Sequence, residues 1–384
     1  MKIAVLGSFS TRYGELWDTR FTDLLAQASC GAIADAKIKS TDIDYIVTSS
    51  MCSGSLSGQL NIGALAADIL HLNIPSVHVE GACASGALAL HTGIAMLESG
   101  KADVVLVNGV EKMTDSPAAT TIQSLMAAAS YESEYSVGAT FPALFAMVTR
   151  AYMHHHGTTR QDLAHVSIKN HFHASMNSLA HFRKKISLAD VINAPMVADP
   201  LSILDCSPVS DGAASLIIAT PEFAKKINTN PVYIIASTLA TDTLALADRE
   251  SIITCKATHI AARKAFAMAG LTPNEVNVVE VHDAFSMGEI IALEDCGFFQ
   301  PGKAAQATVE GLTYFNAQLP VNCSGGLKAK GHPVGASGVG QAVEIVRQLQ
   351  GQCEQRQVKN ASVGLTHSMG GIGATVGVHI FSRE

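Results

Sequence analysis

Short apolar runs alternate with segments of helical periodicity along much of this chain. Residues 3–6 and 43–48 have the pattern of buried strands, and residues 21–36 between them repeat apolar positions as a helix does. The same order returns later, with a helical segment at 257–269, a Gly-Leu-Thr-Pro turn and a strand at 276–281. The pattern predicts a protein of the α/β class.

A second pair of segments shares one layout. The stretch CASGALALHTGIAMLESGKADVVLVNG and the later stretch GASGVGQAVEIVRQLQGQCEQRQVKNASVGLTHSMGG each open with a Gly/Ser-rich turn, continue as a helix and end in a buried strand. One such echo could arise by chance, but two in the same order favour an internal repeat. We therefore expect two βαβ-rich halves of similar plan, with strands covered on both faces.

The region between the two halves, residues 115–240, is less regular. No low-complexity tract or flexible linker separates it from its neighbours, so we expect it to pack onto the main body as an inserted loop domain over the active site. The first half is then predicted to comprise residues 1–114 with a return strand at 241–256, and the second half residues 257–384.

Composition excludes several classes of function. The 384 residues, 48% hydrophobic and only 15% charged, can bury a large core. A net charge of −7 gives no broad attraction for nucleic acid or an anionic membrane surface. No apolar stretch reaches the roughly 20 residues of a membrane-spanning helix, and the first residues lack the pattern of a signal peptide. We expect a cytoplasmic protein that binds neither nucleic acid nor membrane.

The eight cysteines are scattered without a CxxC pair, which predicts no metal site and mostly reduced, buried thiols. Cys83 stands apart, because it lies in VHVEGACASGALAL, where an apolar strand ends and a helix begins. A thiol at a helix N-terminus lies where the dipole and the free N–H groups favour the thiolate. Seen alone, such a cysteine is more often a structural residue at a tight turn.

A glycine-rich loop, NCSGGLKAKGHPVGASGVGQA, surrounds His332 and leads into a helix. Such a loop can hold a histidine over a reacting thioester and donate hydrogen bonds to an oxyanion, and Gly326 within it is a candidate for substrate binding. A phosphate cradle is the competing interpretation, but neither the Walker spacing nor GxGxxG is present.

Two further histidines end apolar strands. His282 follows Val-Val-Glu-Val, and His367 lies in GLTHSMGG. The carboxyl edge of a sheet suits a histidine for proton transfer or oxyanion contact, although a single buried histidine is more often structural.

Together these motifs resemble the thiolase superfamily, in the branch that contains archaeal acetoacetyl-CoA thiolases and the thiolase domain of sterol carrier protein 2. The resemblance is carried, in family order over nearly the whole chain, by GACASGALAL, TFPALFAMVTRAYMHHHGTT, AHFRKKISLADVINAPMVADPLSILDCSPVSDGAA, VHDAF, GGLKAKGHPVGASG and THSMGG. It implies a five-layered α/β/α/β/α thiolase fold and a homodimer or homotetramer. It also implies acyl-CoA substrates, with no cofactor beyond coenzyme A as substrate and product.

The resemblance also implies roles for individual residues. Cys83 takes the place of the acylated nucleophile, and His332 that of the histidine that activates it. His282 stands where other thiolases have an asparagine that holds a catalytic water. The backbone N–H groups of Cys83 and Met369 would form the oxyanion hole. The basic run Arg183-Lys184-Lys185 is a candidate for contacts to the phosphates of coenzyme A, the alternative being a solvated run of charge.

One expected group is missing from the motifs. Thiolases use a second cysteine as the acid/base that takes a proton from the α-carbon of the second acyl group. Its two family positions are occupied here by Thr366-His367-Ser368 and by Ala284. His367 or His282 could serve as the base instead, or Cys323, which precedes the Gly325-Gly326 turn, could reach the site.

The leading hypothesis is an acyl-CoA C-acyltransferase, either an acetyl-CoA acetyltransferase or a 3-ketoacyl-CoA thiolase. A Cys-His-His set also fits decarboxylative condensation, since loss of CO2 generates the carbanion without a base. Acyl transfer to an acceptor other than CoA is a third route, and relatives that work in such complexes partner a small OB-fold, zinc-ribbon protein. The remaining hypothesis is a non-catalytic scaffold, and the presence of Cys83, His282 and His332 argues against it.

Overall fold

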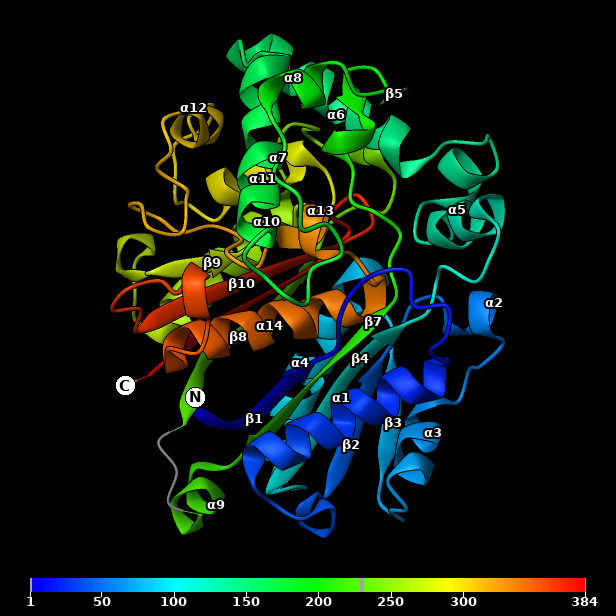
Figure 1. The fold of residues 1–384 in the computed structure, drawn as a ribbon, viewed down its shortest axis with the longest axis vertical. Helices are drawn as coiled ribbons and strands as arrows, with labels where there is room; N and C mark the ends of the chain where they lie inside the picture. The colour runs from blue at the N-terminus through cyan, green and yellow to red at the C-terminus, as the bar shows by residue number, and fades with distance from the viewer. Residues whose placement is uncertain (1, 228–230, 384) are drawn as a thin grey trace.

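The computed structural model describes residues 2–227 and 231–383 of the chain. A nine-stranded sheet runs through the described residues and organises the molecule (Figure 1). From one edge to the other, its strands are β3 (Ser76–Val79), β2 (Tyr45–Ser49), β4 (Val104–Glu111), β7 (Gly212–Ala219), β1 (Ile3–Ser10), β8 (Val232–Thr241), β11 (Thr375–Ser382), β10 (Val363–Gly370) and β9 (Val278–Glu280).

The sheet consists of two half-sheets with the same plan. In the first, β2 is parallel to β3 and β4, and β7 runs antiparallel between β4 and β1. In the second, β9 is parallel to β10, and β11 runs antiparallel between β10 and β8. A short antiparallel pairing of residues 3–5 with residues 232–234 joins them. The two similar halves predicted from the sequence repeats are confirmed.

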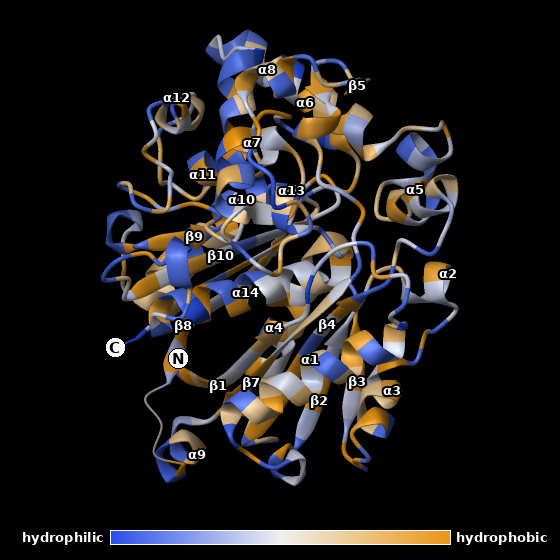
Figure 2. Ribbon diagram, viewed as in Figure 1, coloured by the Kyte–Doolittle hydropathy of each residue, from blue (hydrophilic) through white to orange (hydrophobic). Residues whose placement is uncertain are grey.

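Helices divide the molecule into five layers (Figure 1). Helices α4 (Ser85–Glu98) and α14 (Val334–Gln350) contact strands of both half-sheets and form the central layer. One outer layer contains α1 (Phe21–Ala36) and α3 (Ile62–Ile69), and the other contains α10 (Lys256–Ala269) and α11 (Ser286–Asp295). Figure 2 shows hydrophobic and hydrophilic residues alternating along α1, as expected for a helix with one face on a sheet. The predicted five-layered α/β/α/β/α thiolase fold is confirmed.

The two central helices cross with their backbones in contact. A Cβ atom on Gly86 would lie 2.7 Å from the nitrogen of Val339, and one on Gly338 would lie 2.6 Å from the nitrogen of Ala87. No side chain fits at either position, so glycine permits the approach. The crossing brings the N-terminal ends of α4 and α14 together, and with them the segments that carry Cys83 and His332.

The loop region covers one end of these helices. Its elements are α5 (Ala118–Met126), α6 (Phe141–His156), α7 (Arg160–Ala174), α8 (Leu188–Ile192), β5 (Met196–Ala198) and β6 (Leu201–Ser202). The remaining helices are α2 (Ser53–Ser57), α9 (Pro221–Lys226), α12 (Ala304–Val309) and α13 (Gly326–Lys330). No helix of the described residues has the length and apolar character needed to cross a membrane.

The predicted boundaries of the loop region need correction. Strands β7 and β8 fall inside the predicted range 115–240, yet both belong to the main sheet, and β7 lies between β4 and β1. The return strand is therefore β8, and the predicted strand at 241–256 is wrong, because β8 ends at Thr241 and most of that range is irregular, with one 3-10 turn before α10 begins at Lys256. Residues 115–211 form the part that packs over the site.

Candidate active site

Cys83 lies in a strained turn between β3 and α4. The turn is a short 3-10 helix, Ala82–Ala84, and Ala82 adopts a φ of +53°, a left-handed conformation that residues with side chains rarely adopt. Ser85 holds this conformation, since its Oγ donates to the Ala82 carbonyl at 2.6 Å and accepts from the Gly81 N–H at 2.9 Å. The turn places the thiol at the start of the helix, as the sequence predicts.

Two histidines from the second half meet Cys83. The Cys83 Sγ and one ring nitrogen each of His282 and His332 all lie within 4.8 Å of one another, and all three residues are buried. The two imidazole rings are nearly perpendicular, with centroids 5.2 Å apart. His282 follows β9, and His332 lies just before α14. The structure thus brings together three of the predicted site residues, one from the first half and two from the second.

Hydrogen bonds fix which nitrogen of His332 carries the proton. Its Nδ1 lies 2.7 Å from the Ser337 Oγ, and that hydroxyl donates its single proton to the Pro333 carbonyl at 2.9 Å. The hydroxyl must therefore accept from Nδ1–H, which leaves a lone pair on Nε2. Nε2 has no hydrogen-bond partner among the described residues. Burial, together with the charge of Lys330, lowers the pKa of His332 to about 3, so the ring is neutral.

The Cys83 thiol is protonated at rest, which corrects the prediction of a thiolate. Burial raises the pKa of Cys83 to about 12 and outweighs the lowering by the Gly371 N–H, while the carboxylate of Glu111 raises it further. Cys83 therefore attacks only as its proton leaves. The Nε2 lone pair of His332 is the nearby acceptor suited to take that proton.

Gly371 is a further candidate for an oxyanion donor beside Cys83, and the role predicted for the Met369 N–H stays a prediction. The Gly371 N–H lies near enough to the Cys83 sulfur to lower the pKa of the thiol, and Gly371 lines the cavity around it at a φ of +60°. The Met369 side chain lines a different, smaller cavity, which does not locate its backbone N–H group. The signal in the sequence is the second glycine of Ser-Met-Gly-Gly, since β10 ends at the first one and the chain turns after it.

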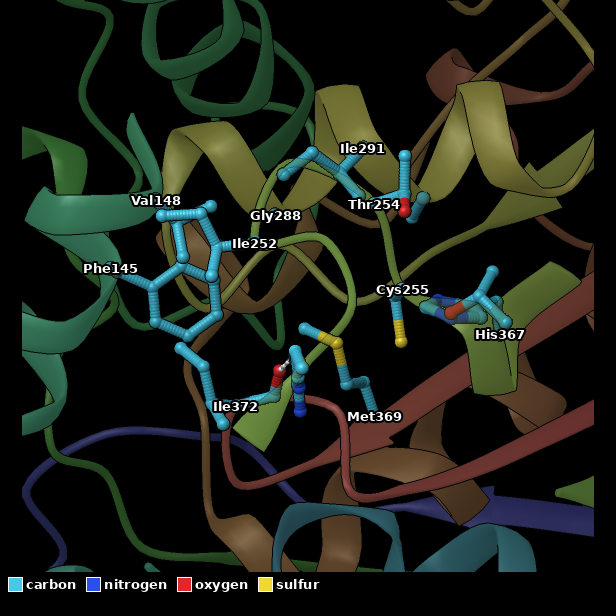
Figure 3. A pocket seen from close by; sticks show the side chains of 13 residues that line it. Phe145, Val148, Ile252, Thr254, Cys255, Gly288, Ile291, His367, Met369 and Ile372 are labelled. Carbon is cyan, nitrogen blue, oxygen red and sulfur yellow. Dashed lines mark hydrogen bonds between the residues drawn. The ribbon is translucent and has the colours of Figure 1, made fainter. Parts of the chain in front are cut away.

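His367 lies outside the Cys83 cavity and contacts the backbone of His282. Figure 3 shows it beside Cys255 and Met369 in that smaller cavity, which does not include Cys83. Its Nδ1 accepts from the His282 N–H at 3.4 Å, and its Nε2 lies 2.9 Å from the Thr258 hydroxyl. Both ring nitrogens are occupied, so His367 positions the segment of His282 and does not reach the thiol.

Three other predicted positions lie away from Cys83. Cys323 is fully buried in the hydrophobic core around α4 and α14, so the prediction that it reaches the site is wrong. Gly326 lies where a Cβ would overlap the carboxylate of Asp283, which accepts from the Leu327 N–H at 2.6 Å. Its role is to let that carboxylate hold the loop. The basic run Arg183-Lys184-Lys185 is exposed, and its contact with coenzyme A stays a prediction.

Glu111 is a residue that motif reasoning missed. Its buried carboxylate accepts from the Ser50 hydroxyl at 2.6 Å and from the N–H groups of Met51, Cys52 and Gly335 at 2.8, 3.1 and 2.9 Å. Gly335 belongs to the first turn of α14, so Glu111 ties the first half of the molecule to the segment that follows His332. No local pattern marks this role, because its partners come from distant parts of the chain.

A cavity of about 420 Å³ opens over the three residues. Its walls are mostly apolar and come from α5 and α6, with Met126, Phe141 and Phe145, and from Phe285, which stacks on Phe145 at 4.3 Å between ring centroids. Such a volume is typical of a small-molecule site and suits an acyl chain attached to a thioester.

Comparisons with known proteins agree with this geometry. The chain matches the thiolase N-terminal domain over residues 3–222 and the thiolase C-terminal domain-like family over residues 238–383. It is 48% identical over 382 residues to an acetyl-CoA acetyltransferase of Methanothermobacter thermautotrophicus, covering 99% of both chains. It is 33% identical to human sterol carrier protein 2, covering 93% of this chain and 67% of that protein.

Solved structures share the fold at lower identity. An acetyl-CoA acetyltransferase from Syntrophomonas wolfei has a TM-score of 0.77 at 18% identity, covering 100% of this chain and 99% of that one. The Ltp2-ChsH2(DUF35) aldolase has a TM-score of 0.86 at 23% identity, covering 100% and 98%. With its two family matches, its close relatives and its Cys-His-His site, this chain belongs to the thiolase family.

Proposed function

We propose that this protein transfers acyl groups to and from coenzyme A through an acyl-Cys83 intermediate, as an acetyl-CoA acetyltransferase or 3-ketoacyl-CoA thiolase. The observation that carries the proposal is the buried Cys83 thiol beside the unpartnered Nε2 of His332. The names of the archaeal relatives support acetyl-CoA as a substrate. Coenzyme A is substrate and product, and we propose no other cofactor.

The proposed first half-reaction uses Cys83, His332 and two backbone N–H groups. His332 Nε2 takes the thiol proton as the Cys83 sulfur attacks the thioester carbonyl carbon. The carbonyl oxygen gains negative charge, and the backbone N–H groups of Cys83 and Gly371 are the donors that stabilise it, an effect typically worth about 3 kcal/mol per donor. The bond from carbon to the CoA sulfur then breaks and leaves the acyl group on Cys83.

Steady-state kinetics test the proposed reaction. We expect thiolysis of acetoacetyl-CoA by coenzyme A with ping-pong kinetics, because the acyl-enzyme forms before the second substrate reacts. A series of longer 3-ketoacyl-CoAs then reports the chain length that the cavity accepts. Release of CO2 from malonyl-CoA, with no thiolysis of any 3-ketoacyl-CoA, would contradict the proposal and favour decarboxylative condensation.

Assembly and location are further parts of the proposal. We propose a homodimer or homotetramer in the cytoplasm, with a small OB-fold, zinc-ribbon protein as a partner. Support for the partner comes from the structural neighbour whose title names a DUF35 protein in its complex. Sedimentation equilibrium of the purified chain distinguishes these assemblies from a monomer, which would contradict the proposed oligomer.

A further inference from the structure

The cavity over Cys83 contains a second thiol. Cys206 lines it together with Cys83, His282 and His332, although the sequence analysis predicts no role for it. It follows the 3-10 turn at residues 203–205 in the loop region, far along the chain from the other three.

Backbone pairing fixes the place of Cys206. It forms an antiparallel bridge with Phe285, and the N–H of the next residue, Ser207, donates to the Ala284 carbonyl at 2.8 Å. Cys206 therefore lies beside the segment that leaves His282. Ala284 itself lines the cavity with a methyl group only, so it leaves space on this wall.

The second half-reaction requires a group of this kind. Making a carbon–carbon bond from two acyl groups requires a proton to leave the α-carbon of a thioester. Among the described residues that line the cavity, none is Asp, Glu, Lys or Tyr, which leaves two cysteines and two histidines. In the acyl-enzyme, Cys83 carries the acyl group and His332 holds the proton taken from Cys83. His282 and Cys206 remain.

The two histidines point to a ligand bound between them and the thiols. Both are more than nine-tenths buried, and His282 Nδ1 and His332 Nε2 have no hydrogen-bond partner among the described residues. Two N–H donors suit the thioester oxygen of a second acyl-CoA, whose charge grows as the α-carbon loses its proton. If both histidines donate hydrogen bonds to the thioester oxygen, the group in the cavity that is left to accept the α-proton is Cys206.

We propose that Cys206 is the acid/base of the second half-reaction, a step that rests on the proposed transfer through acyl-Cys83. As the first coenzyme A leaves, the Cys206 thiol gives its proton to the CoA sulfur and becomes a thiolate. That thiolate then takes a proton from the α-carbon of the second acyl-CoA. The α-carbon attacks the carbonyl carbon of acyl-Cys83, the bond to sulfur breaks, and the Cys83 sulfur recovers its proton from His332. Both cysteines end as thiols.

A buried positive charge assists the thiolate form of Cys206. Burial raises the pKa of Cys206 to about 11, while the charge of Lys328 lowers it. The Lys328 ammonium is fully buried and donates to the carbonyl of Asp205, the residue before Cys206, at 2.6 Å. In the resting protein the Cys206 thiol donates to the Ser202 carbonyl at 3.4 Å, which holds the side chain on the cavity wall.

Exchange of the α-protons tests this assignment. The protein is incubated with acetyl-CoA in D2O, and deuterium in the acetyl group is measured beside the acetyl adduct on the protein. In Cys206→Ala we expect a normal adduct on Cys83 but exchange slowed by about 100-fold or more, the size of a lost general base. Cys30→Ala, at an exposed cysteine of α1 outside the cavity, should match the wild type in both measurements.

The outcomes separate this proposal from the one on which it rests. Exchange and condensation at wild-type rates in Cys206→Ala would overturn the role of Cys206 and assign the proton to His282. Absence of any adduct on the wild type would instead overturn the proposed function itself. Cys206→Ser, which keeps the size and the hydrogen bond to Ser202, gives the same comparison if the alanine variant does not fold.

Discussion

At the scale of single residues, the site depends on one hydroxyl that sets the protonation of a base. Ser337 accepts from His332 Nδ1 because its own proton is bound to the Pro333 carbonyl. This leaves Nε2 free to accept the proton of Cys83. The same arrangement keeps the imidazole in place without a charged partner, which agrees with its neutral form.

Replacement of Ser337 tests this role. Ser337→Ala is expected to slow acylation of Cys83 by about 10- to 100-fold, as loss of a group that orients a functional histidine does elsewhere. Ser337→Thr, which keeps the hydroxyl, should retain most of the rate. The burst of CoA release on mixing with acetyl-CoA measures it, and Ser99→Ala at the exposed end of α4 is the control. A wild-type burst in Ser337→Ala would contradict the assignment.

Sequence motifs identified the site residues that have reactive side chains, cysteine and histidine. Cys83, His282 and His332 lie together as the sequence indicates. Gly371 and Cys206 line the cavity but were not singled out from the sequence, since a backbone N–H has no side-chain signature and Cys206 is placed on the cavity wall by pairing with a distant segment. Cys323 was misassigned because closeness to a glycine-rich loop does not show which way a side chain points.

At the scale of elements, the crossing of α4 and α14 holds the two halves of the site together. Gly86 lies three residues after Cys83, and Gly338 lies six residues after His332. Because each glycine touches the backbone of the other helix, a side chain there must push the helices apart. The distance between the thiol and its base depends on this contact.

Gly86→Ala tests the crossing. The added methyl is expected to cost about 1–3 kcal/mol of stability through overpacking and to slow acylation, because the helix N-termini separate. Thermal unfolding and the CoA burst measure the two effects. Ala95→Gly, at an exposed position of the same helix, costs about 1 kcal/mol through helix propensity alone and should leave the burst unchanged. Equal activity in both variants would contradict this account.

The bounds of helices whose apolar positions repeat regularly were predicted well, whereas the strands within residues 115–240 were assigned to the wrong part of the fold. The helix at 21–36 has the bounds predicted for it, because its apolar positions recur with a helical period. Strands β7 and β8 were assigned to the loop region, since an apolar run does not reveal which distant strands it pairs with. Their pairing with β1 is a long-range contact that local sequence does not reveal.

At the scale of the whole molecule, burial keeps many histidines neutral. Burial lowers the pKa of eight of them: His91, His171, His173, His181, His282, His332, His367 and His379. Burial raises the pKa of four carboxyl groups: Glu111, Glu280, Asp283 and Asp295. The two sets act on stability in opposite directions as the pH falls.

Stability should fall as the pH drops below about 6.5. In that range the unfolded chain binds protons on histidines that stay neutral when folded. Each fully buried histidine costs at most about 1.4 kcal/mol per pH unit, and the half-buried His91 and His181 cost less because solvent screens them. The raised carboxyl groups bind protons in the folded state and offset part of this loss, but the histidines outnumber them. We therefore expect Tm to decrease from pH 7 to pH 5 in differential scanning calorimetry. A constant or rising Tm over that interval would contradict the inference.

Intact-protein mass spectrometry after incubation with acetyl-CoA shows whether Cys83 carries the acyl group. We expect a gain of one acetyl group, located on Cys83 by peptide mapping, lost on addition of coenzyme A and absent from Cys83→Ala. A wild-type protein without the adduct, or an adduct that persists in Cys83→Ala, would contradict it.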